Sequence, residues 1–362
     1  MLIQKFTTLF KDVTRQGTKI PKEEYLTHGK NIIIDQGQDI IAGYTNCEDG
    51  IFKKIPAIVF GDHTRIIKYV DTPFFLGADG VKVLKCTDKN ANYRYLYYAL
   101  KNAHIPNTGY NRHFKWLKEI TINYPDKNKQ NDIVNILDKL EYIIKIRSQE
   151  LDKFDELIKA RFVEMFGDPV LNSNDYKLIK LSNLGTLSRG KSKHRPRNDP
   201  KLLGGPYPLI QTGDITNSGI FIKKYNNTYS KLGLKQSKMW PAGTLCITIA
   251  ANIAQTAILS FDACFPDSVV GFIPKADIIT TTYLHYWFSF FQKILDAQAS
   301  QVAQKNINLK VLSNLDVAVP PITEQDKFLS FVQQVDKSKV AVQKSLEETQ
   351  TLFDSLMQKY FG

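Results

Sequence analysis

The chain has 362 residues, enough for two domains with ordinary hydrophobic cores. Hydrophobic residues make up 43% of it and aromatic residues 11%, which excludes a disordered protein. The formal net charge of +12 favours an anionic partner, and nucleic acid before a membrane surface. No apolar run approaches the ~18 residues of a transmembrane helix, no signal peptide is evident, and the four cysteines are scattered. We therefore expect a cytoplasmic protein with reduced thiols and no membrane partner.

An internal repeat divides the chain into halves, because at a spacing of 195 residues the end of one half matches the end of the other without a gap. The matched pairs include Pro125 with Pro320, Gln130 with Gln325, Leu151 with Leu346, Phe166 with Phe361 and Gly167 with Gly362. Further upstream the halves diverge. The repeat predicts two similar supports that carry two different heads. The expected segments are a first head at 1–123, a helix at 126–167, a second head at 168–318 and a helix at 322–361.

The first head alternates short apolar runs with turn residues, which predicts an α/β domain. Runs rich in β-branched and aromatic residues fall at 31–34, 55–60, 66–70 and 81–84, and a helical pattern falls at 93–101. The polar turns between them carry amide, aromatic and basic side chains that can contact bases or phosphates, although Asn and Gln in turns also cap backbone groups. The candidate DNA contacts of this head are Gln36, Gln38, Tyr44, His63, Arg65, Asn107, Tyr110 and Arg112. His63 and His113 lack metal-ligand neighbours at usable spacing, so we expect surface or capping histidines.

The first long helix shows an apolar stripe whose steps alternate between three and four residues, the coiled-coil period. Its members are Leu137, Leu140, Ile144, Leu151, Phe154 and Ile158, with Arg147 filling the remaining seam position. Asn128 stands where a helix N-cap is expected. Phe166-Gly167-Asp168-Pro169 predicts a sharp stop, with the glycine available for a left-handed cap.

The second head contains the densest basic cluster of the chain, Arg189 to Arg197. Five permanent cations in nine residues, with Gly190 and Pro196 preventing a long helix, predict an exposed flexible loop suited to phosphate or guanine contact. A solvated loop without a partner is the alternative. Strand-like runs follow at 244–249, 257–261 and 269–273, and a helical pattern at 282–295. The candidate DNA contacts of this head are Arg189, Lys191, Lys193, Arg195, Arg197, Gln211, Thr212, Asn252, Gln255, Gln304 and Lys305.

The second long helix repeats the seam with Val332, Val335, Val342, Leu346 and Phe353, and with Lys339 and Thr349 as polar members. Thr323 stands at the N-cap, and Asp326 three residues later resembles a capping box. Because neither stripe is wide enough to bury a helix alone, we expect the two helices to pack on each other as an antiparallel coiled coil. The heads would then be related by an approximate two-fold axis. Two separate core helices are the alternative.

Signatures of catalysis are missing from the sequence. We find no Gly-x-Gly cofactor loop, Walker loop, His-Glu-x-x-His motif or nucleophile elbow. Asn123-Tyr124-Pro125-Asp126 is a poor match to the Asn-Pro-Pro-aromatic motif of amino-methyltransferases. The sequence therefore predicts a non-catalytic reader that binds no cofactor or metal of its own.

Two divergent heads, each followed by a long helix that opens near Pro-x₄-Gln, resemble the specificity subunit of type I restriction-modification systems. The stretches Gly213-Asp214-Ile215 and 306–321 are similar to parts of its target-recognition domains. A tryptophan-led opening common in that family is absent, and Leu2–Asp12 is a shorter substitute, which leaves the edge of the first head undefined.

The resemblance implies two α/β target-recognition domains, each reading one half of a bipartite DNA target across a gap set by the helices. It also implies two methyltransferase subunits that use S-adenosylmethionine to methylate adenine, and restriction-translocase subunits that use ATP and Mg²⁺. Three alternatives stay open: the reader of another nuclease-methylase system, a basic scaffold for acidic proteins, and an enzyme with an unrecognised site.

Overall fold

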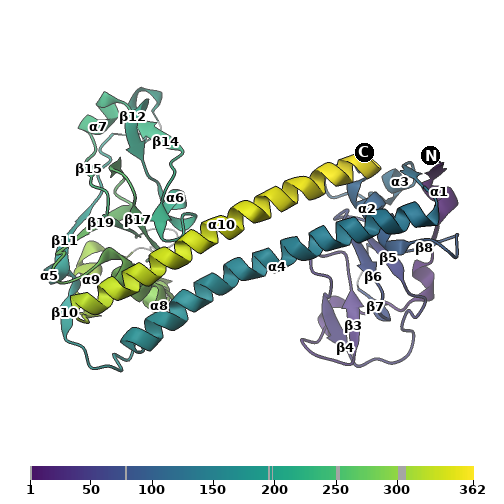
Figure 1. The fold of residues 1–362 in the computed structure, drawn as a ribbon, viewed down its shortest axis with the longest axis horizontal. Helices are drawn as coiled ribbons and strands as arrows, with labels where there is room; N and C mark the ends of the chain where they lie inside the picture. Colours follow the sequence, from purple (N-terminus) through teal and green to yellow (C-terminus); the bar gives the residue numbers. More distant parts are fainter. Residues whose placement is uncertain (1, 78–79, 195, 198, 250–252, 301–306) are drawn as a thin grey trace. The chain divides into compact units, whose positions relative to one another are not determined.

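The chain divides into two compact units in the computed structural model, which describes residues 2–77, 80–194, 196–197, 199–249, 253–300 and 307–362. Unit 1 comprises residues 1–149 with 342–362, and unit 2 comprises residues 150–341 (Figure 1). Each unit therefore contains one head together with a part of each long helix.

The two long helices have 40 residues each, α4 (Lys127–Phe166) and α10 (Ile322–Phe361). All the residues predicted for their two seams are buried or half-buried. In unit 1, Arg147 donates hydrogen bonds to the Ser345 carbonyl and to Thr349 Oγ1. In unit 2, Lys339 Nζ lies 2.7 Å from Asp155 Oδ1. Residues later in α4 contact residues earlier in α10, so the two helices run antiparallel. The predicted antiparallel coiled coil is therefore confirmed, and its polar seam members contact the opposite helix.

The helix starts differ from the prediction, and the N-caps assigned to Asn128 and Thr323 are wrong. The carboxylate of Asp126 accepts the Lys129 N–H at 3.0 Å, so Asp126 caps α4. Pro321 precedes α10, and its carbonyl accepts the N–H groups of Glu324 and Gln325 at 3.0 and 3.2 Å. The end of α4 is as predicted, because Gly167 follows it with a φ of +73°.

The described residues of unit 1 form three sheets and three short α-helices. A four-stranded sheet has the order β2-β8-β5-β6, a three-stranded sheet the order β4-β3-β7, and β1 pairs with β9. The strands are β1 (Ile3–Lys5), β2 (Phe10–Asp12), β3 (Asn31–Ile34), β4 (Gly43–Thr45), β5 (Ala57–Gly61), β6 (Ile67–Val70), β7 (Phe74–Leu76), β8 (Val81–Cys86) and β9 (Thr121–Asn123). The helices are α1 (Phe6–Leu9), α2 (Tyr93–Asn102) and α3 (Phe114–Leu117), with 3-10 turns at Thr14–Gln16 and Lys22–Glu24. The strands and the helix expected in the first head are present.

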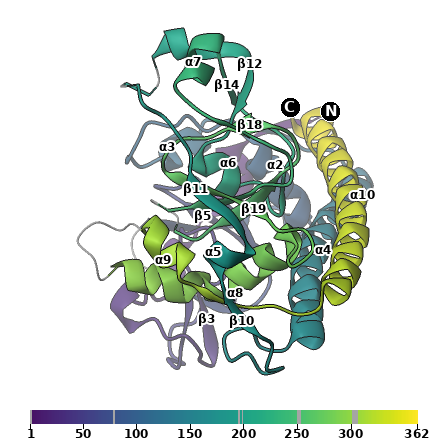
Figure 2. The same ribbon diagram turned by 90° about the vertical axis from the view of Figure 1, so that its left-hand side faces the viewer.

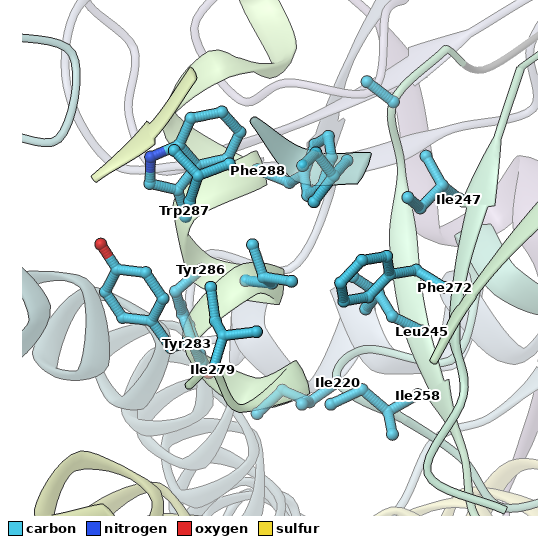
Figure 3. Close-up of a cluster of buried hydrophobic side chains, with 14 of the residues drawn as sticks. Ile220, Leu245, Ile247, Ile258, Phe272, Ile279, Tyr283, Tyr286, Trp287 and Phe288 are labelled. Carbon is cyan, nitrogen blue, oxygen red and sulfur yellow. The ribbon is translucent and has the colours of Figure 1, made fainter. Parts of the chain in front are cut away.

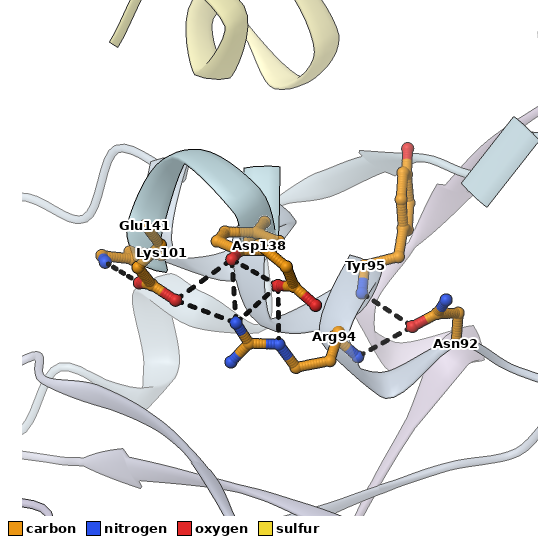
Figure 4. Close-up of polar contacts among 7 residues, drawn as sticks. Asn92, Arg94, Tyr95, Lys101, Asp138 and Glu141 are labelled. Carbon is orange, nitrogen blue, oxygen red and sulfur yellow. Dashed lines mark hydrogen bonds and ion pairs between the residues drawn. The ribbon is translucent and has the colours of Figure 1, made fainter. Parts of the chain in front are cut away.

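Helix α2 is fixed to α4 by a polar network (Figure 4). Arg94 Nη2 lies 2.6 Å from Asp138 Oδ1 and 2.8 Å from Glu141 Oε2, both on α4. The opposite face of α2 buries Leu96, Ala99 and Leu100 in the core. A charged side chain thus orients the same helix that hydrophobic burial holds in place.

Unit 2 repeats this plan with additions. Its five-stranded sheet has the order β11-β19-β16-β17-β13, a second sheet has the order β14-β12-β18-β15, and β10 pairs with β20. Figures 1 and 2 show the ribbon of this unit in two views. The strands are β10 (Leu178–Lys180), β11 (Gly185–Arg189), β12 (Leu203–Leu209), β13 (Phe221–Ile222), β14 (Asn227–Tyr229), β15 (Met239–Trp240), β16 (Leu245–Thr248), β17 (Thr256–Leu259), β18 (Ala263–Cys264), β19 (Val269–Pro274) and β20 (Asp316–Ala318). The helices are α5 (Leu181–Leu184), α6 (Thr212–Thr216), α7 (Lys231–Lys235), α8 (Thr281–Ser300) and α9 (Leu309–Ser313), with a 3-10 turn at Pro200–Leu202.

The largest core of unit 2 lies between α8 and the five-stranded sheet. Trp287 and Phe288 of α8 belong to one buried cluster with Leu245, Ile247 and Phe272 of the sheet (Figure 3). Four strands of this sheet match β2-β8-β5-β6 in order and direction, and the parallel pair β12–β18 matches β3–β7. The prediction of two α/β heads of one fold is therefore confirmed.

The repeated Pro-x₄-Gln motif forms the same contact in both units, which we call the glutamine clamp. Gln130 Nε2 donates to the Pro125 carbonyl at 2.8 Å, and its Oε1 accepts the Asn92 N–H at 3.3 Å. Gln325 Nε2 donates to the Pro320 carbonyl at 2.9 Å, and its Oε1 accepts the Thr280 N–H at 2.8 Å. Each buried amide thus joins the start of a long helix to the segment that leads into the helix of its head.

No helix in the described part of the chain has both the length and the apolar character needed to cross a membrane.

Candidate nucleic-acid interface

Several predicted contacts of the first head meet at one end of the four-stranded sheet, which we call the loop end of unit 1. Strand β5 ends there at Gly61, opposite Val81 at the start of β8. In the neighbouring sheet, β3 ends at Ile34 opposite Leu76 of the parallel strand β7. Because of this strand pairing, the loops after β3 and after β5 lie at the same end of the sheets as the start of β8.

Gln36, His63 and Tyr110 form a chain of contacts at this loop end. Gln36 Oε1 accepts the His63 N–H at 3.2 Å, and the Gln36 carbonyl accepts a hydrogen bond from Thr64 Oγ1 at 2.6 Å. The ring of His63 stacks on Tyr110 with 4.7 Å between centroids and 10° between planes. Tyr110 is 88% exposed, so a flat aromatic surface faces solvent on a supported ring. Such a surface can stack on a base or contact a thymine methyl group.

The loop that carries Tyr110 is anchored by His113. The backbone N–H of His113 donates to the Asp62 carbonyl at 2.7 Å, and its Nδ1 lies 3.0 Å from the same oxygen. Asp62 Oδ1 accepts the Phe114 N–H at 2.7 Å. His113 is fully buried at the N-cap position of α3 and its side chain makes no capping bond, so it is not a surface histidine and caps the helix by position alone. A partner of the buried ring is Asp62 on the hairpin turn. Because Asp62 and His113 are 51 residues apart in the sequence, local patterns do not reveal this contact.

Lys68 of β6 holds the loop after β3 in place, a role that the sequence did not predict. Lys68 Nζ donates to the Asp39 carbonyl at 2.5 Å and lies 3.6 Å from Asp35 Oδ1. Burial lowers the pKa of Lys68, and the nearby carboxylate of Asp35 opposes that shift. The side chain of Lys68 is only 3% exposed, so it positions the loop while Gln38 on that loop is exposed. The cation gave no sequence signal because a lysine inside a strand pattern usually faces solvent.

The remaining candidates of the first head have distinct environments. Arg65, at a φ of +63°, donates from Nη1 to the Ile105 carbonyl at 3.1 Å. Asn107 Oδ1 accepts the Gly109 N–H at 3.2 Å, so this amide is partly used in the loop itself. Arg112 is exposed. Tyr44 lies in β4, half-buried, with its ring 6.4 Å from that of His28.

Unit 2 has an equivalent loop end. Strand β11 ends at Arg189 opposite Val270, and β16 ends at Thr248 opposite Val269 of the same strand β19. The Ile307 N–H donates to the Ile249 carbonyl at 3.2 Å, as His113 bonds to Asp62 in unit 1. The last loop of each head is therefore joined to the hairpin turn that follows β5 or β16.

The basic cluster is partly ordered by its neighbours. Arg189 is the exposed last residue of β11, which corrects its assignment to a flexible loop, and Lys191 and Lys193 are exposed beyond it. Arg197 forms an ion pair with Asp267, 70 residues away in sequence. Arg197, Gln211 and Thr212 line one pocket of about 150 Å³ together with Ser192 and Ser268. The structure thus brings together two separate groups of predicted residues.

Gln211 immediately precedes α6, and Asp214 fixes this turn. Asp214 Oδ2 accepts the Gln211 N–H at 2.8 Å, while its Oδ1 accepts from Asn226 Nδ2 at 2.9 Å. Gln211 is exposed, and Gln255 is half-buried with its backbone paired to Thr248. Arg195, Asn252, Gln304 and Lys305 lie outside the described residues.

The chemistry of both loop ends is that of binding. Amide, aromatic and cationic side chains lie on the loops that follow the strands, an arrangement suited to the edges of bases and to phosphates. Among the described residues, no group of three or more His, Cys, Asp or Glu side chains is placed to hold a metal ion.

Comparison with known proteins agrees with this arrangement. The family model of the type I restriction modification DNA specificity domain matches the chain twice, at residues 8–154 and 173–349. The chain belongs to this family. Each match covers one head and an adjoining part of one long helix, so the specificity domain occurs once per head.

Individual members of the family are distant in sequence. The specificity subunit of the type I restriction enzymes EcoR124I and EcoR124II from Escherichia coli is 23% identical over 84% of this chain and 79% of its own length. The EcoBI specificity subunit from Escherichia coli is 28% identical over 58% of this chain and 46% of its own length.

Solved structures share the fold. The S subunit of a type I restriction-modification system from M. genitalium covers all of this chain, and 96% of that subunit is covered, with a TM-score of 0.64 at 17% identity. A chain from a structure of the assembly and conformational transition of the type I R-M system covers 99% of this chain, with 97% of its own length covered, a TM-score of 0.59 and 15% identity. At such identities the likeness establishes the fold alone.

Proposed function

We propose that this protein is the DNA-reading subunit of a type I restriction-modification complex and that its two heads recognise the two halves of a bipartite target. The family accounts for reading DNA sequence, and the internal repeat supports two readers. The loop end of unit 1 would read one half-site and that of unit 2 the other. The paired helices α4 and α10 would set the gap between them.

One observation carries the proposal: the same loop end is built twice with different side chains. In unit 1 it exposes Gln38 and Tyr110, whereas in unit 2 it exposes Lys191, Lys193 and Gln211. Equal scaffolds with unequal contact surfaces are expected of two readers for different sequences. A scaffold for one acidic partner would not need the difference.

Phosphate and base contacts would be shared among these residues. The exposed cations Arg189, Lys191 and Lys193 suit phosphates, which fix the position of the duplex without reading it. Gln38 and Gln211 are exposed amides of the type that pairs with adenine in the major groove. Tyr110 supplies an aromatic face for a base edge or a thymine methyl group.

The complex would divide its chemistry among its subunits. Two methyltransferase subunits would bind S-adenosylmethionine and methylate adenine, and restriction-translocase subunits would bind ATP and Mg²⁺. The present chain would be non-catalytic and would need no cofactor. Because DNA is the proposed ligand, the complex would act in the cytoplasm.

The test is to co-express the chain with the methyltransferase encoded beside it and to map adenine methylation at base resolution. We expect a split motif with a fixed gap. A soluble complex with an active methyltransferase but no methylated motif would contradict the proposal and favour a scaffold.

A further inference from the structure

The residues that follow β2 in unit 1 are structurally equivalent to the basic cluster that follows β11 in unit 2. The order strand, short helix, strand is the same in β1-α1-β2 and β10-α5-β11. Asp12 of β2 faces Leu84 in β8, as Leu187 of β11 faces Phe272 in β19. The stretch from Thr14 to Lys19 is therefore the counterpart of 189–194.

Backbone hydrogen bonds hold this stretch on both sides. Val83 N donates to Thr14 Oγ1 at 2.9 Å, which fixes the beginning to β8. Thr18 N donates to the Gly50 carbonyl at 3.0 Å, and Leu76 N donates to the Thr18 carbonyl at 3.0 Å. A side chain at Gly17 would collide with Leu76, because its Cβ would lie 2.4 Å from Leu76 Cδ1. The stretch therefore has one supported conformation at the loop end of unit 1.

Cations gather around this stretch. Arg15, Lys19 and Lys82 line a hollow of about 650 Å³, with Asp12 as its acidic member. Lys82 Nζ lies 3.5 Å from Asp12 Oδ2, so that carboxylate partly balances the charge of Lys82, while Arg15 and Lys19 add two further cations to the lining. Arg15 and Lys19 are exposed.

The hollow adjoins the residues proposed to read bases. Lys82 lies in β8 next to Val81, which pairs with Gly61 before the turn that carries His63. The Nζ atoms of Lys82 and Lys118 lie 5.3 and 4.9 Å from the ring centroid of Phe114, whose N–H is bonded to Asp62 of the same turn. The cations thus border the loop end on one side.

We propose that Arg15, Lys19 and Lys82 form a phosphate-binding site for the DNA backbone beside the first half-site. This inference rests on the proposed function and adds to it a site in the first head. A duplex whose base edges meet the loop end must pass its sugar-phosphate backbone beside it, and cations there release counterions on contact. The site would position the DNA without reading its sequence.

The double variant Arg15→Ala/Lys19→Ala tests the site in the full chain, in complex with its methyltransferase partner. The DNA is a duplex carrying the target found by methylation mapping. We expect the slope of log K against log salt to become shallower by about 0.9 for each lost contact. The same relation gives a roughly fivefold weaker affinity per contact at about 0.15 M salt. Phosphate protection in a footprint should be lost beside the first half-site and kept beside the second.

Matched variants separate charge from folding. Lys89→Ala removes an exposed cation beyond the other end of β8 and should leave slope and footprint unchanged. Arg15→Lys/Lys19→Arg keeps both charges and should restore the slope.

Three outcomes would count against the site. A double variant with the wild-type slope and footprint refutes it while leaving the proposed function intact. A variant that loses the methyltransferase partner but binds DNA normally shows that the cations contact protein. A wild-type complex without preference for the mapped target refutes the proposed function itself.

Discussion

Gln325 shows how much one buried amide does in this protein. Its Oε1 accepts the Thr280 N–H, and its Nε2 donates to the carbonyls of Ile278 and Pro320 at 3.0 and 2.9 Å. The residue is 0% exposed, so no water replaces these partners. A single side chain thereby satisfies three backbone groups from two segments that meet at the start of α10.

We predict that Gln325→Leu lowers the free energy of unfolding by about 3 kcal/mol, because unsatisfied buried polar groups cost about 1–3 kcal/mol each. Gln130→Leu should cost less, since Gln130 has a long 3.3 Å bond to Asn92. Denaturant unfolding measures both. Gln343→Leu, at an exposed position of α10, is the control. A Gln325→Leu loss no greater than that of the control would show that the clamp is not structural.

A second residue-scale prediction concerns pH. Burial lowers the pKa of His285 to about 4, and its Nδ1 lies 2.9 Å from Thr256 Oγ1. In the unfolded chain the imidazole titrates near 6.5. The unfolded state therefore binds the proton first, and stability falls as the pH drops from about 6.5 to about 4.

Between pH 7.5 and 5.0 this histidine should remove up to about 2 kcal/mol of stability. The His285→Gln variant cannot titrate at this position. Its free energy of unfolding should therefore fall by about 2 kcal/mol less than that of the wild type between the two pH values, as measured by urea unfolding. Equal losses in wild type and variant would mean that folding does not lower the pKa of His285.

At the residue scale the sequence identified candidates but not their partners. Exposed positions such as Gln38, Tyr110 and Lys191 follow from their polar turns. Gln36 was expected to face a ligand, yet its Oε1 is bonded to His63, and Arg197 is paired with Asp267. These contacts join segments 27 and 70 residues apart, and local patterns carry no information about such pairs.

At the scale of elements, the period of the hydrophobic residues was sufficient to predict a helix or strand wherever one of its faces is buried. Both seams and seven strands follow from hydrophobic patterns of period 3.5 or 2. β12 was missed because its Leu-Gly-Gly-Pro-Tyr-Pro-Leu sequence reads as a turn. Its Pro and Gly residues are accommodated by an irregular register against β14.

The paired helices permit a prediction about the gap. Seven residues inserted into each helix, after Gln149 and after Ala341, preserve the 3.5-residue seam. They lengthen each helix by about 10 Å, close to three base pairs at about 3.4 Å. We expect the gap of the methylated motif to widen by about three base pairs, as mapped by adenine methylation. The same insertion into α4 alone leaves seven residues without a partner on α10 and should abolish methylation. An unchanged gap in the double insertion would remove the helices as the determinant of spacing.

At the scale of the whole molecule, each compact unit has its own core and its own clamp. Replacing residues 168–318 by the second head of a family member should change one half of the methylated motif and leave the other half and the gap as before. The reciprocal exchange of residues 1–123 should change the other half. A motif altered in both halves by one exchange would contradict independent reading.

The glutamine clamp has a consequence for how such proteins diversify. It uses only a proline carbonyl, one amide and the start of a head helix, so it places no demand on the loops at the other side of the sheet. A genetic crossover anywhere along α4 would deliver a foreign head with its connector already attached. New target sequences would then arise by exchange of whole heads in single steps.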